Sequence, residues 1–342
     1  MEVACLHDDG RTISARRFEA QETASMTAFL RGSCGPEVRV VMDSTTGVVD
    51  GLLLAAGFRV LRADPGVLPP RPVAGSVPAP VLAAVAHRAP DRLVELDTES
   101  GTLKGRTREV FEAVRRSADT ARRLAGSGHF LKQGPPGRRT IALTFDDGPS
   151  TEHTEHVLDI LRDFEVVATF FCVGLNVRGL PRLVARMAEE GHTVGIHTWS
   201  HPILSDLSRD EFLFQLDETV RVISGATGDS PRLVRPPYGC RTDDTLRWTA
   251  GHGLVTVLWD RDSRDWTMPG ETAIVETVRR GVSDGSVVLM HDGGGDRRQT
   301  VAALPTLLTA LLDDSYEPVT VEDMLAVPEG GLSARAGDRE QL

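Results

Sequence analysis

Residues 141–149 read IALTFDDGP, and this segment decides how the rest of the chain is interpreted. Its apolar first half leads into two adjacent carboxylates, Asp146 and Asp147, and the dipeptide Gly148-Pro149 follows at once. The pattern predicts a buried strand that delivers both acids to the loop at its end. Two neighbouring carboxylates in one site repel each other, so a metal ion or an arginine must lie close to them.

Strands and helices alternate at short intervals from residue 139 onward. Apolar runs predict strands at 141–145, 168–173, 193–196, 233–234, 254–259, 286–290 and 317–320. Amphipathic patterns predict helices between them, at 155–164, 181–190, 209–227, 242–252, 271–281 and 300–312. Repeated strand–helix units with buried strands indicate an α/β fold with a parallel sheet, and this many units favour a barrel.

The first part of the chain has the pattern of a separate, smaller α/β unit. Strands are expected at 3–6, 12–18, 38–42 and 58–61, and helices at 20–31, 46–56 and 103–124. Six prolines make residues 64–80 an extended connector that cannot be helical. Glycine and proline cluster again between residues 126 and 137 and mark a boundary. We therefore expect an N-terminal domain over 1–126, a second domain over 139–327 and a polar C-terminal tail over 328–342.

Composition and charge exclude several classes of protein. The net charge of −11 argues against a nucleic acid or an anionic membrane as partner, because both require basic clusters. The four cysteines, Cys5, Cys34, Cys172 and Cys240, have no C-x-x-C spacing, so we expect free thiols and neither a disulfide framework nor a thiolate zinc site. The amino terminus lacks the pattern of a signal peptide, and no apolar run is long enough to span a membrane. We expect a cytoplasmic protein.

Polar side chains follow most of the predicted strands of the second domain. In a parallel barrel, the carboxyl ends of the strands form the face on which sites are built. Taken singly, each of these residues is more often a turn, a cap or a core residue, but their occurrence at successive strand ends favours one shared site. They are Asp146, Asp147, His197, His201, Arg235, Asp262, Asp265, Trp266, His291 and Asp292.

These residue types can form a hydrolytic metal site. His197, His201 and one carboxylate are a standard three-ligand set for catalytic Zn²⁺, with an open position for water. One of the paired acids can bind the metal, and the other can take a proton from the bound water. Arg235 could keep that second acid ionised, and His291 could protonate a leaving group while Asp265 orients its ring.

Three further positions could complete such a site. Trp266 and Leu289 would offer an apolar pocket for a small acyl group. The rigid turn that contains Tyr238 follows two prolines, and it could direct a backbone N–H at an oxyanion.

Five segments, taken in order, resemble the motifs of the polysaccharide deacetylase family, the NodB-homology domain of carbohydrate esterase family 4. They are residues 144–149, 197–201, 235–239, 262–266 and 289–292, and the resemblance covers residues 139–327. It implies a distorted (β/α) barrel. It also implies removal of acetyl groups from an N-acetylated carbohydrate by attack of a metal-bound water, with Zn²⁺ as the expected metal and Co²⁺ as an alternative.

The resemblance also implies a role for each matching residue. By motif position, Asp146 would be the catalytic base, Arg235 would position it, and the metal ligands would be Asp147, His197 and His201. His291 would be the general acid, and Asp265 would tune it. Tyr238 would be the oxyanion donor through its backbone N–H, and the acetyl pocket would be lined by Trp266 and Leu289. The loop at residues 293–296 is similar to the one that follows the last motif in this family.

The order of strands and helices in the N-terminal part is similar to the ribonuclease-H-like unit of certain bacterial transposases. Asp8 or Asp9 together with Asp43 could then be Mg²⁺ ligands. Acids at turns and helix starts are more commonly turn or capping residues, so a scaffold or interaction role is the interpretation we favour.

The substrate and the oligomeric state stay open at this point. Chitooligosaccharides, peptidoglycan and related glycans all carry the required acetamide group. Two other functions fit the sequence: a cytoplasmic amidase that deacetylates a small metabolite, and a glycan-binding protein without catalysis.

Overall fold

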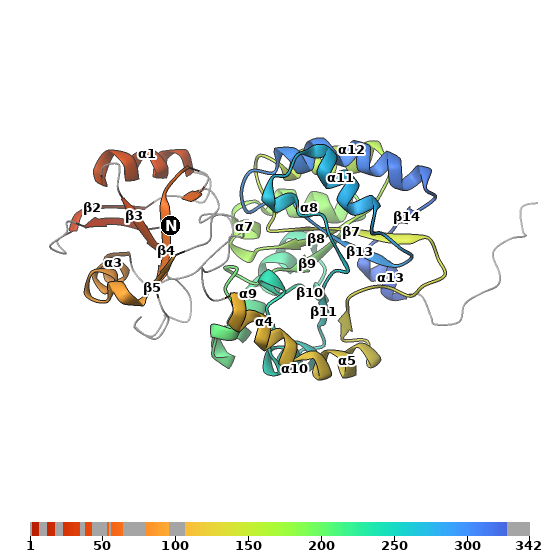
Figure 1. Cartoon of the computed structure of the whole chain (residues 1–342), viewed down its shortest axis with the longest axis horizontal. Coiled ribbons are helices and arrows are strands. Elements are labelled where there is room, and N and C mark those ends of the chain that lie inside the picture. Colours follow the sequence, from red (N-terminus) through yellow and green to blue (C-terminus); the bar gives the residue numbers. More distant parts are fainter. Residues whose placement is uncertain are drawn as a thin grey trace, which may run out of the picture.

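The computed structural model describes residues 2–6, 12–17, 23–34, 38–42, 53–54, 56–63, 79–95 and 107–326. The described part of the N-terminal unit contains two small sheets. One pairs two strands antiparallel, and in the other β3–β4 is parallel and β4–β5 antiparallel. Its elements are β1 (Glu2–Leu6), β2 (Thr12–Arg17), α1 (Thr23–Cys34), β3 (Arg39–Met42), β4 (Arg59–Ala63), α3 (Ala79–Arg88), the short 3₁₀ helix η2 (Pro90–Arg92) and β5 (Leu93–Glu95). Figure 1 shows α1 and α3 on opposite sides of the three-stranded sheet.

The prediction of an extended connector over 64–80 is wrong at its C-terminal end. Helix α3 begins at Ala79, so Ala79 and Pro80 form its first turn. Proline fits there because the first-turn N–H groups have no helical acceptor and the fixed φ of proline suits a helix. Residues 64–78 lie outside the described part of the chain, as do the candidate ligands Asp8, Asp9 and Asp43. The ribonuclease-H-like interpretation stays a prediction.

Two helices lead from the N-terminal unit to the barrel, where a single helical stretch was expected. They are α4 (Thr107–Arg116) and α5 (Ala118–Gly126). Ser117 separates them, and its hydroxyl donates a hydrogen bond of 2.8 Å to the carbonyl oxygen of Val114. Serine favours such breaks because its side chain competes for backbone hydrogen bonds.

The second domain is built on a nine-stranded parallel sheet with the order β12-β13-β7-β8-β9-β10-β11-β6, in which β14 also pairs with β7. Among the described strands, β12 and β6 at the two edges do not pair with each other, so the barrel is open and the predicted distorted (β/α) barrel is confirmed. The strands are β6 (Phe130–Leu131), β7 (Thr140–Asp146), β8 (Thr169–Cys172), β9 (Thr193–Ile196), β10 (Leu233–Val234), β11 (Val255–Val257), β12 (Arg261–Asp262), β13 (Ser286–His291) and β14 (Glu317–Pro318).

Helices cover the outside of this sheet (Figure 1). The longest, α9, begins at a capping box between Ser208 and Glu211 and ends at Gly228, whose φ of 83° suits a residue without Cβ. The α-helices are α6 (Thr154–Asp163), α7 (Gly174–Gly179), α8 (Pro181–Glu189), α9 (Arg209–Thr227), α10 (Asp243–Gly251), α11 (Glu271–Arg279), α12 (Arg298–Asp313) and α13 (Val321–Ala326). Three 3₁₀ helices lie in the loops: η3 (Leu204–Asp206), η4 (Pro237–Gly239) and η5 (Asp265–Thr267).

Strand β7 shows how the sequence places the site. Ile141, Leu143 and Phe145 belong to the large apolar cluster between sheet and helices, whereas Ala142 belongs to the cluster inside the barrel. Because side chains alternate along a strand, Asp146 falls on the same side as Ala142 and therefore faces the barrel interior.

The strand register brings the other candidate residues to the same level. His291 pairs with Asp146 across β13 and β7. Ile196 pairs with Val234 across β9 and β10, so the next residues, His197 and Arg235, leave the sheet side by side.

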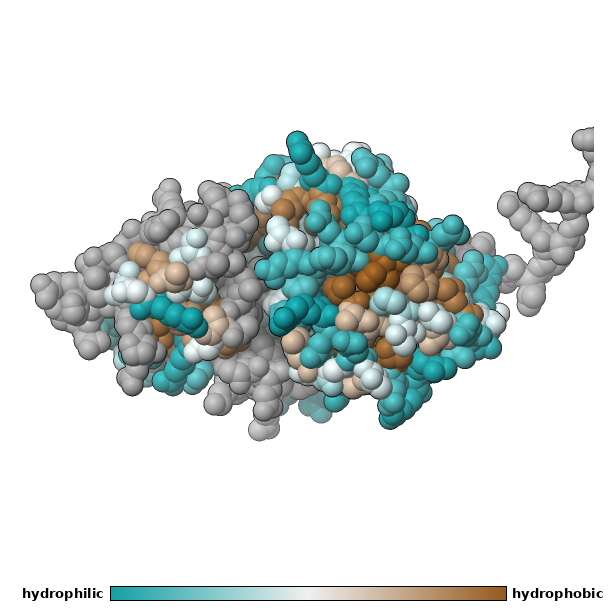
Figure 2. Space-filling model, turned by 90° about the horizontal axis from the view of Figure 1, so that it is seen from above, coloured by the Kyte–Doolittle hydropathy of each residue, from teal (hydrophilic) through white to brown (hydrophobic). Residues whose placement is uncertain are grey.

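The apolar core of the N-terminal unit continues into the barrel. We call this cluster the shared core; it contains Met26, Leu30, Leu53, Phe58 and Val60 together with Ile203 and Cys240 of the barrel. Figures 1 and 2 agree that the N-terminal unit lies at one end of the barrel, next to α7 in Figure 1. Helix α7 directly follows β8, so this is the end at which the parallel strands terminate.

The described residues include no helix that is long and apolar enough to cross a membrane. Cys172 and Cys240 are buried free thiols, as expected for these two positions. The cytoplasmic location stays a prediction.

Candidate active site

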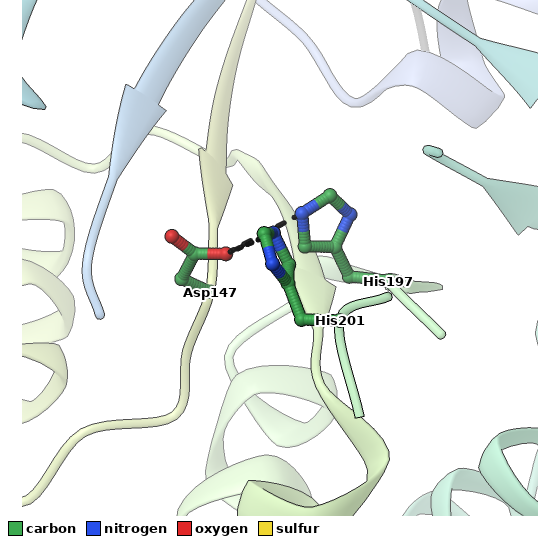
Figure 3. A group of neighbouring side chains, drawn as sticks. All are labelled: Asp147, His197 and His201. Atoms are coloured by element: carbon green, nitrogen blue, oxygen red, sulfur yellow. Dashed lines mark ion pairs between the residues drawn. The ribbon is translucent and has the colours of Figure 1, made fainter. Parts of the chain in front are cut away.

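Three of the predicted ligands converge at the carboxyl ends of β7 and β9 (Figure 3). Oδ1 of Asp147 lies 3.1 Å from Nε2 of His201 and 3.4 Å from Nε2 of His197. All three side chains are buried, and their candidate ligand atoms lie within 4.8 Å of one another. The structure therefore forms the three-ligand cluster from residues that are up to 54 positions apart in the chain, counting from 147 to 201.

Asp147 is held by its backbone. It follows β7 in a left-handed conformation, with φ of 73°, and its carbonyl oxygen accepts a hydrogen bond of 2.9 Å from the side-chain amide of Asn176. The loop at 293–296 packs directly against it. A Cβ on Gly294 would lie 2.3 Å from Oδ2 of Asp147, so only glycine permits this close approach.

The imidazole of His197 has a fixed orientation and tautomer. Its Nδ1 lies 2.7 Å from the carbonyl oxygen of Arg235. A carbonyl oxygen only accepts hydrogen bonds, so Nδ1 carries the proton and Nε2 presents a lone pair toward Asp147. This is the arrangement that metal-binding histidines usually have.

His201 is placed by a tight loop that begins directly after β9. Both Thr198 and His201 have left-handed backbones, with φ of 66° and 54°. The Thr198 hydroxyl accepts the His201 N–H over 3.0 Å, and Oε1 of Gln215 on α9 accepts the N–H groups of Trp199 and Ser200 over 2.8 and 2.9 Å. Side chains thus satisfy the backbone donors of this loop.

The donor set fits a small divalent cation. Oδ1 of Asp147 is buried and has no hydrogen-bond partner among the described residues, although a lone pair of His197 faces it. A carboxylate oxygen and an imidazole nitrogen at this distance need a cation or a proton between them. Ligand bonds of about 2.0–2.2 Å in a tetrahedral zinc site place ligand atoms about 3.3 Å apart, which matches the observed spacings. Burial raises the pKa of Asp147, but His201 and His197 outweigh it and hold that pKa well below its ordinary value.

Asp146 has a different environment from its neighbour. Its Oδ1 accepts a hydrogen bond of 2.8 Å from the Arg235 guanidinium, while Oδ2 lies 3.8 Å from Nε2 of His197. Arg235 is fully buried and also donates to the Thr144 hydroxyl over 2.6 Å and to the Leu258 carbonyl over 3.2 Å. Its guanidinium carbon lies 4.1 Å from the ring centre of Phe171. Burial lowers the pKa of Arg235 and Asp146 opposes this, but an arginine stays charged at any physiological pH.

The half-buried His291 pairs with the buried Asp265 on the other side of Asp146. Nδ1 of His291 lies 2.8 Å from Oδ1 of Asp265, and Oδ2 of Asp265 accepts the His291 backbone N–H over 2.8 Å and the Thr300 hydroxyl over 2.9 Å. Burial lowers the pKa of His291, but the Asp265 carboxylate outweighs it and raises that pKa to about 9. His291 therefore carries a proton at neutral pH.

The three remaining candidates lie on β13, η5 and η4. Leu289 is buried on β13, and Trp266 is half-buried on η5. The ring of Tyr238 meets the edge of the His201 ring at a centroid distance of 4.8 Å. Tyr238 has a left-handed backbone with φ of 58°. The roles assigned to these residues from the motifs stay predictions.

The sequence analysis assigned no role to Asp292, which the structure buries completely beside Asp147. Its Oδ2 accepts a hydrogen bond of 2.6 Å from the Thr154 hydroxyl, and burial, with Asp147 and Asp146 nearby, raises its pKa to about 7. A Cβ on Gly148 would lie 2.2 Å from this carboxylate. The available signal was its place directly after His291 in the last motif. Asn176 and Gln215, which hold the ligand loops, were missed as well.

Fold and site together define a class of hydrolase: an open (β/α) barrel with a two-histidine, one-carboxylate metal cluster at the carboxyl ends of its strands. A family model described as polysaccharide deacetylase matches residues 133–257. A peptidoglycan-N-acetylglucosamine deacetylase of Bacillus cereus is 38% identical over 204 residues, which cover 59% of this chain and 95% of that protein. A chitooligosaccharide deacetylase of Sinorhizobium fredii is 42% identical over 191 residues, which cover 53% of this chain and 89% of that protein. The chain belongs to the polysaccharide deacetylase family, as the motifs predicted.

Solved structures agree with this assignment. The Bc1960 peptidoglycan N-acetylglucosamine deacetylase is 34% identical with a TM-score of 0.57, over 59% of this chain and 94% of that chain. BA3943 of Bacillus anthracis, described as a family 4 pseudoenzyme, is 30% identical with a TM-score of 0.54, over 57% of this chain and 68% of that chain. Because one of these similar structures is a pseudoenzyme, catalysis depends on the residues of the site and not on the fold alone.

Proposed function

We propose that this protein uses a divalent metal ion held by Asp147, His197 and His201 to hydrolyse the acetamide group of an N-acetylated glycan. The observation that carries the proposal is the buried Oδ1 of Asp147, which faces two imidazole nitrogens at 3.1 and 3.4 Å. Zinc is the metal we propose, and cobalt suits the same ligands. When bound, the ion lowers the pKa of a water molecule and draws electrons from the acetyl carbonyl.

Asp146 is the general base of the proposed reaction. Arg235 engages Oδ1, so Oδ2, on the side of His197, is available to take the proton of the attacking water. The water oxygen then bonds to the acetyl carbon.

His291 is the general acid. Its raised pKa keeps it protonated at neutral pH, and Asp265 fixes the ring through Nδ1, so Nε2 is the atom that can donate. The proton goes to the sugar nitrogen as the carbon–nitrogen bond breaks, which leaves acetate and a free amine.

The pocket for the acetyl group is assigned to Trp266 and Leu289, and the oxyanion contact to the backbone N–H of Tyr238. The support is their motif position and, for Tyr238, the packing of its ring on the ligand His201. An N–H directed at the developing oxyanion stabilises charge where it forms.

The substrate we propose is a glycan that contains N-acetylglucosamine. The support is the pair of relatives named for peptidoglycan N-acetylglucosamine and for chitooligosaccharides. A small N-acetylated metabolite is a second candidate, because the apolar core of the N-terminal unit packs against Tyr238, at the turn assigned to the oxyanion contact.

The test is acetate release by the zinc-loaded full chain from N-acetylglucosamine, from chitooligosaccharides of increasing length and from peptidoglycan, each run with wild type and Asp146→Asn. We expect acetate from at least one of them with wild type and none with Asp146→Asn, and the dependence on length separates the two substrate candidates. A zinc-loaded protein that binds a glycan and releases no acetate from any of them would instead be a non-catalytic glycan-binding protein.

A further inference from the structure

The N-terminal unit touches the barrel at the two loops that carry the reaction. Of the barrel residues in the shared core, Ile203 lies two positions after the metal ligand His201, and Cys240 lies two positions after Tyr238. Ile203 is 2% exposed and Cys240 is fully buried. Tyr238 itself packs against the shared core. The contact therefore falls at the ends of the ligand loop and of the oxyanion turn.

Both loops have backbone conformations that need support. His201 and Tyr238 are non-glycine residues with φ of 54° and 58°. Such left-handed backbones are unfavourable for residues with a Cβ and persist only where surrounding contacts enforce them.

The barrel and the shared core both hold the ligand loop. Gln215 and Thr198 hold the loop from within the barrel through backbone hydrogen bonds, before and at His201. Beyond His201, the side chain of Ile203 is buried in the shared core. The rings of His201 and Tyr238 then join the two loops edge to face.

We propose that the N-terminal unit is a positioning element for the deacetylase site: its apolar core, through Ile203 and Cys240, holds His201 and the Tyr238 turn in their active geometry. The expected change in activity rests on the proposed function. The expected change in metal affinity is measurable without any substrate.

The two faces of the N-terminal sheet pack against different clusters. Leu30 of α1 is 4% exposed and lies in the shared core. Leu82 of α3 is 8% exposed and packs with Val41 and Leu93 in a different cluster, which contains no barrel residue within the described part of the chain. Leu30→Ala and Leu82→Ala therefore remove the same side-chain atoms from the same unit, and only the first weakens the support of the two loops.

The experiment compares both variants with wild type in the full chain. Zinc dissociation constants are measured by competition with a chromophoric chelator, and kcat and KM with the best substrate from the acetate-release screen. Leu30→Ala should raise the zinc dissociation constant about tenfold, the size usual for losing support of a metal ligand. It should also lower kcat with little change in KM, and Leu30→Met should restore most of both. Leu82→Ala should stay within about twofold of wild type.

Three results would overturn the inference. Leu30→Ala with wild-type zinc affinity and kcat would mean that the unit does not position the loops. Equal losses in both leucine variants would mean that general unfolding of the N-terminal unit is the cause. A rise in KM alone would mean that the unit contacts the glycan directly.

One further variant and one further outcome complete the test. Ile203→Val removes one methylene from the barrel side while the N-terminal unit stays intact, so it should change zinc affinity in the same direction as Leu30→Ala, by a smaller factor. If wild type released no acetate from any substrate, the proposed function would fail, and the zinc measurements would still decide whether the N-terminal unit positions His201.

Discussion

Arg235 acts on the site from both its backbone and its side chain. Its carbonyl oxygen accepts from Nδ1 of His197 over 2.7 Å, and its guanidinium donates to Asp146 over 2.8 Å. One residue thus orients a proposed metal ligand and holds the proposed base beside it. This explains why two neighbouring acids, Asp146 and Asp147, face such different partners.

Substitution of Asp146 and of Asp147 should impair different properties of the site. Asp147→Asn should release the metal, because it replaces the carboxylate that faces both imidazoles, whereas Asp146→Asn should keep it. Acetate release should fall by about 10²–10⁴-fold in Asp146→Asn, the usual contribution of a general base. The measurement is metal content per chain after dialysis, beside acetate release. Equal loss of metal in both variants would show that the roles are wrongly assigned.

Arg235→Met should destabilise the fold strongly. The change leaves the Asp146 carboxylate, whose side chain is 4% exposed, without its cationic partner, which costs about 3–5 kcal/mol of unfolding free energy. Urea unfolding measures this. The matched control is Arg298→Met, since the Arg298 side chain is 82% exposed and solvent screens its pair with Asp296. Similar losses in both variants would contradict the assigned importance of the buried pair.

Asp265→Asn should change the pH dependence of the reaction. His291 must hold a proton to act as acid, so wild-type kcat should fall as pH rises through about 9, the pKa that Asp265 confers against the effect of burial. Without that carboxylate the basic limb should move down by about 1–3 pH units. Asp296→Asn is the control, because Asp296 pairs with Arg298 instead of His291. An unmoved basic limb in Asp265→Asn would assign it to another group.

Asp292→Asn should alter how stability depends on pH in the metal-free protein. Burial raises the pKa of Asp292 to about 7, so the folded state binds a proton that the unfolded state releases near pH 4. This contribution to wild-type stability is present at low pH and is lost as pH rises from about 4 to 7. Relative to wild type, the variant should therefore gain stability over that interval. Urea unfolding with a chelator at several pH values tests this, and parallel curves would contradict it.

The chemistry-bearing residues were predictable because they lie at the ends of long apolar strands. The strands that end at Asp146 and His291 contain continuous apolar runs, and a parallel sheet brings their carboxyl ends together. The short strand β6 was not predictable in the same way, although the equally short β10 was expected at 233–234. Strand β6 has two residues and pairs with β11, more than a hundred positions later, so only the folded sheet defines it.

The residues that hold the loops of the site were not predicted from the sequence, for a related reason. Gln215 lies within a long helix, where glutamine normally faces water, and its role depends on the loop that packs over it. The burial of Asp292 depends on Gly148 in the same way, because the missing side chain makes room for the carboxylate. The contact between the N-terminal unit and Ile203 leaves no pattern in either segment alone.

The burial of Cys240 has a consequence for its reactivity. Burial raises the pKa of this thiol, and the shared core surrounds it with apolar neighbours. A chain shortened to the barrel would lose those neighbours, and the Cys240 thiol would become open to oxidation and to disulfide-linked dimers on a newly exposed apolar surface. Within the full chain, the packing of the shared core keeps this thiol away from solvent.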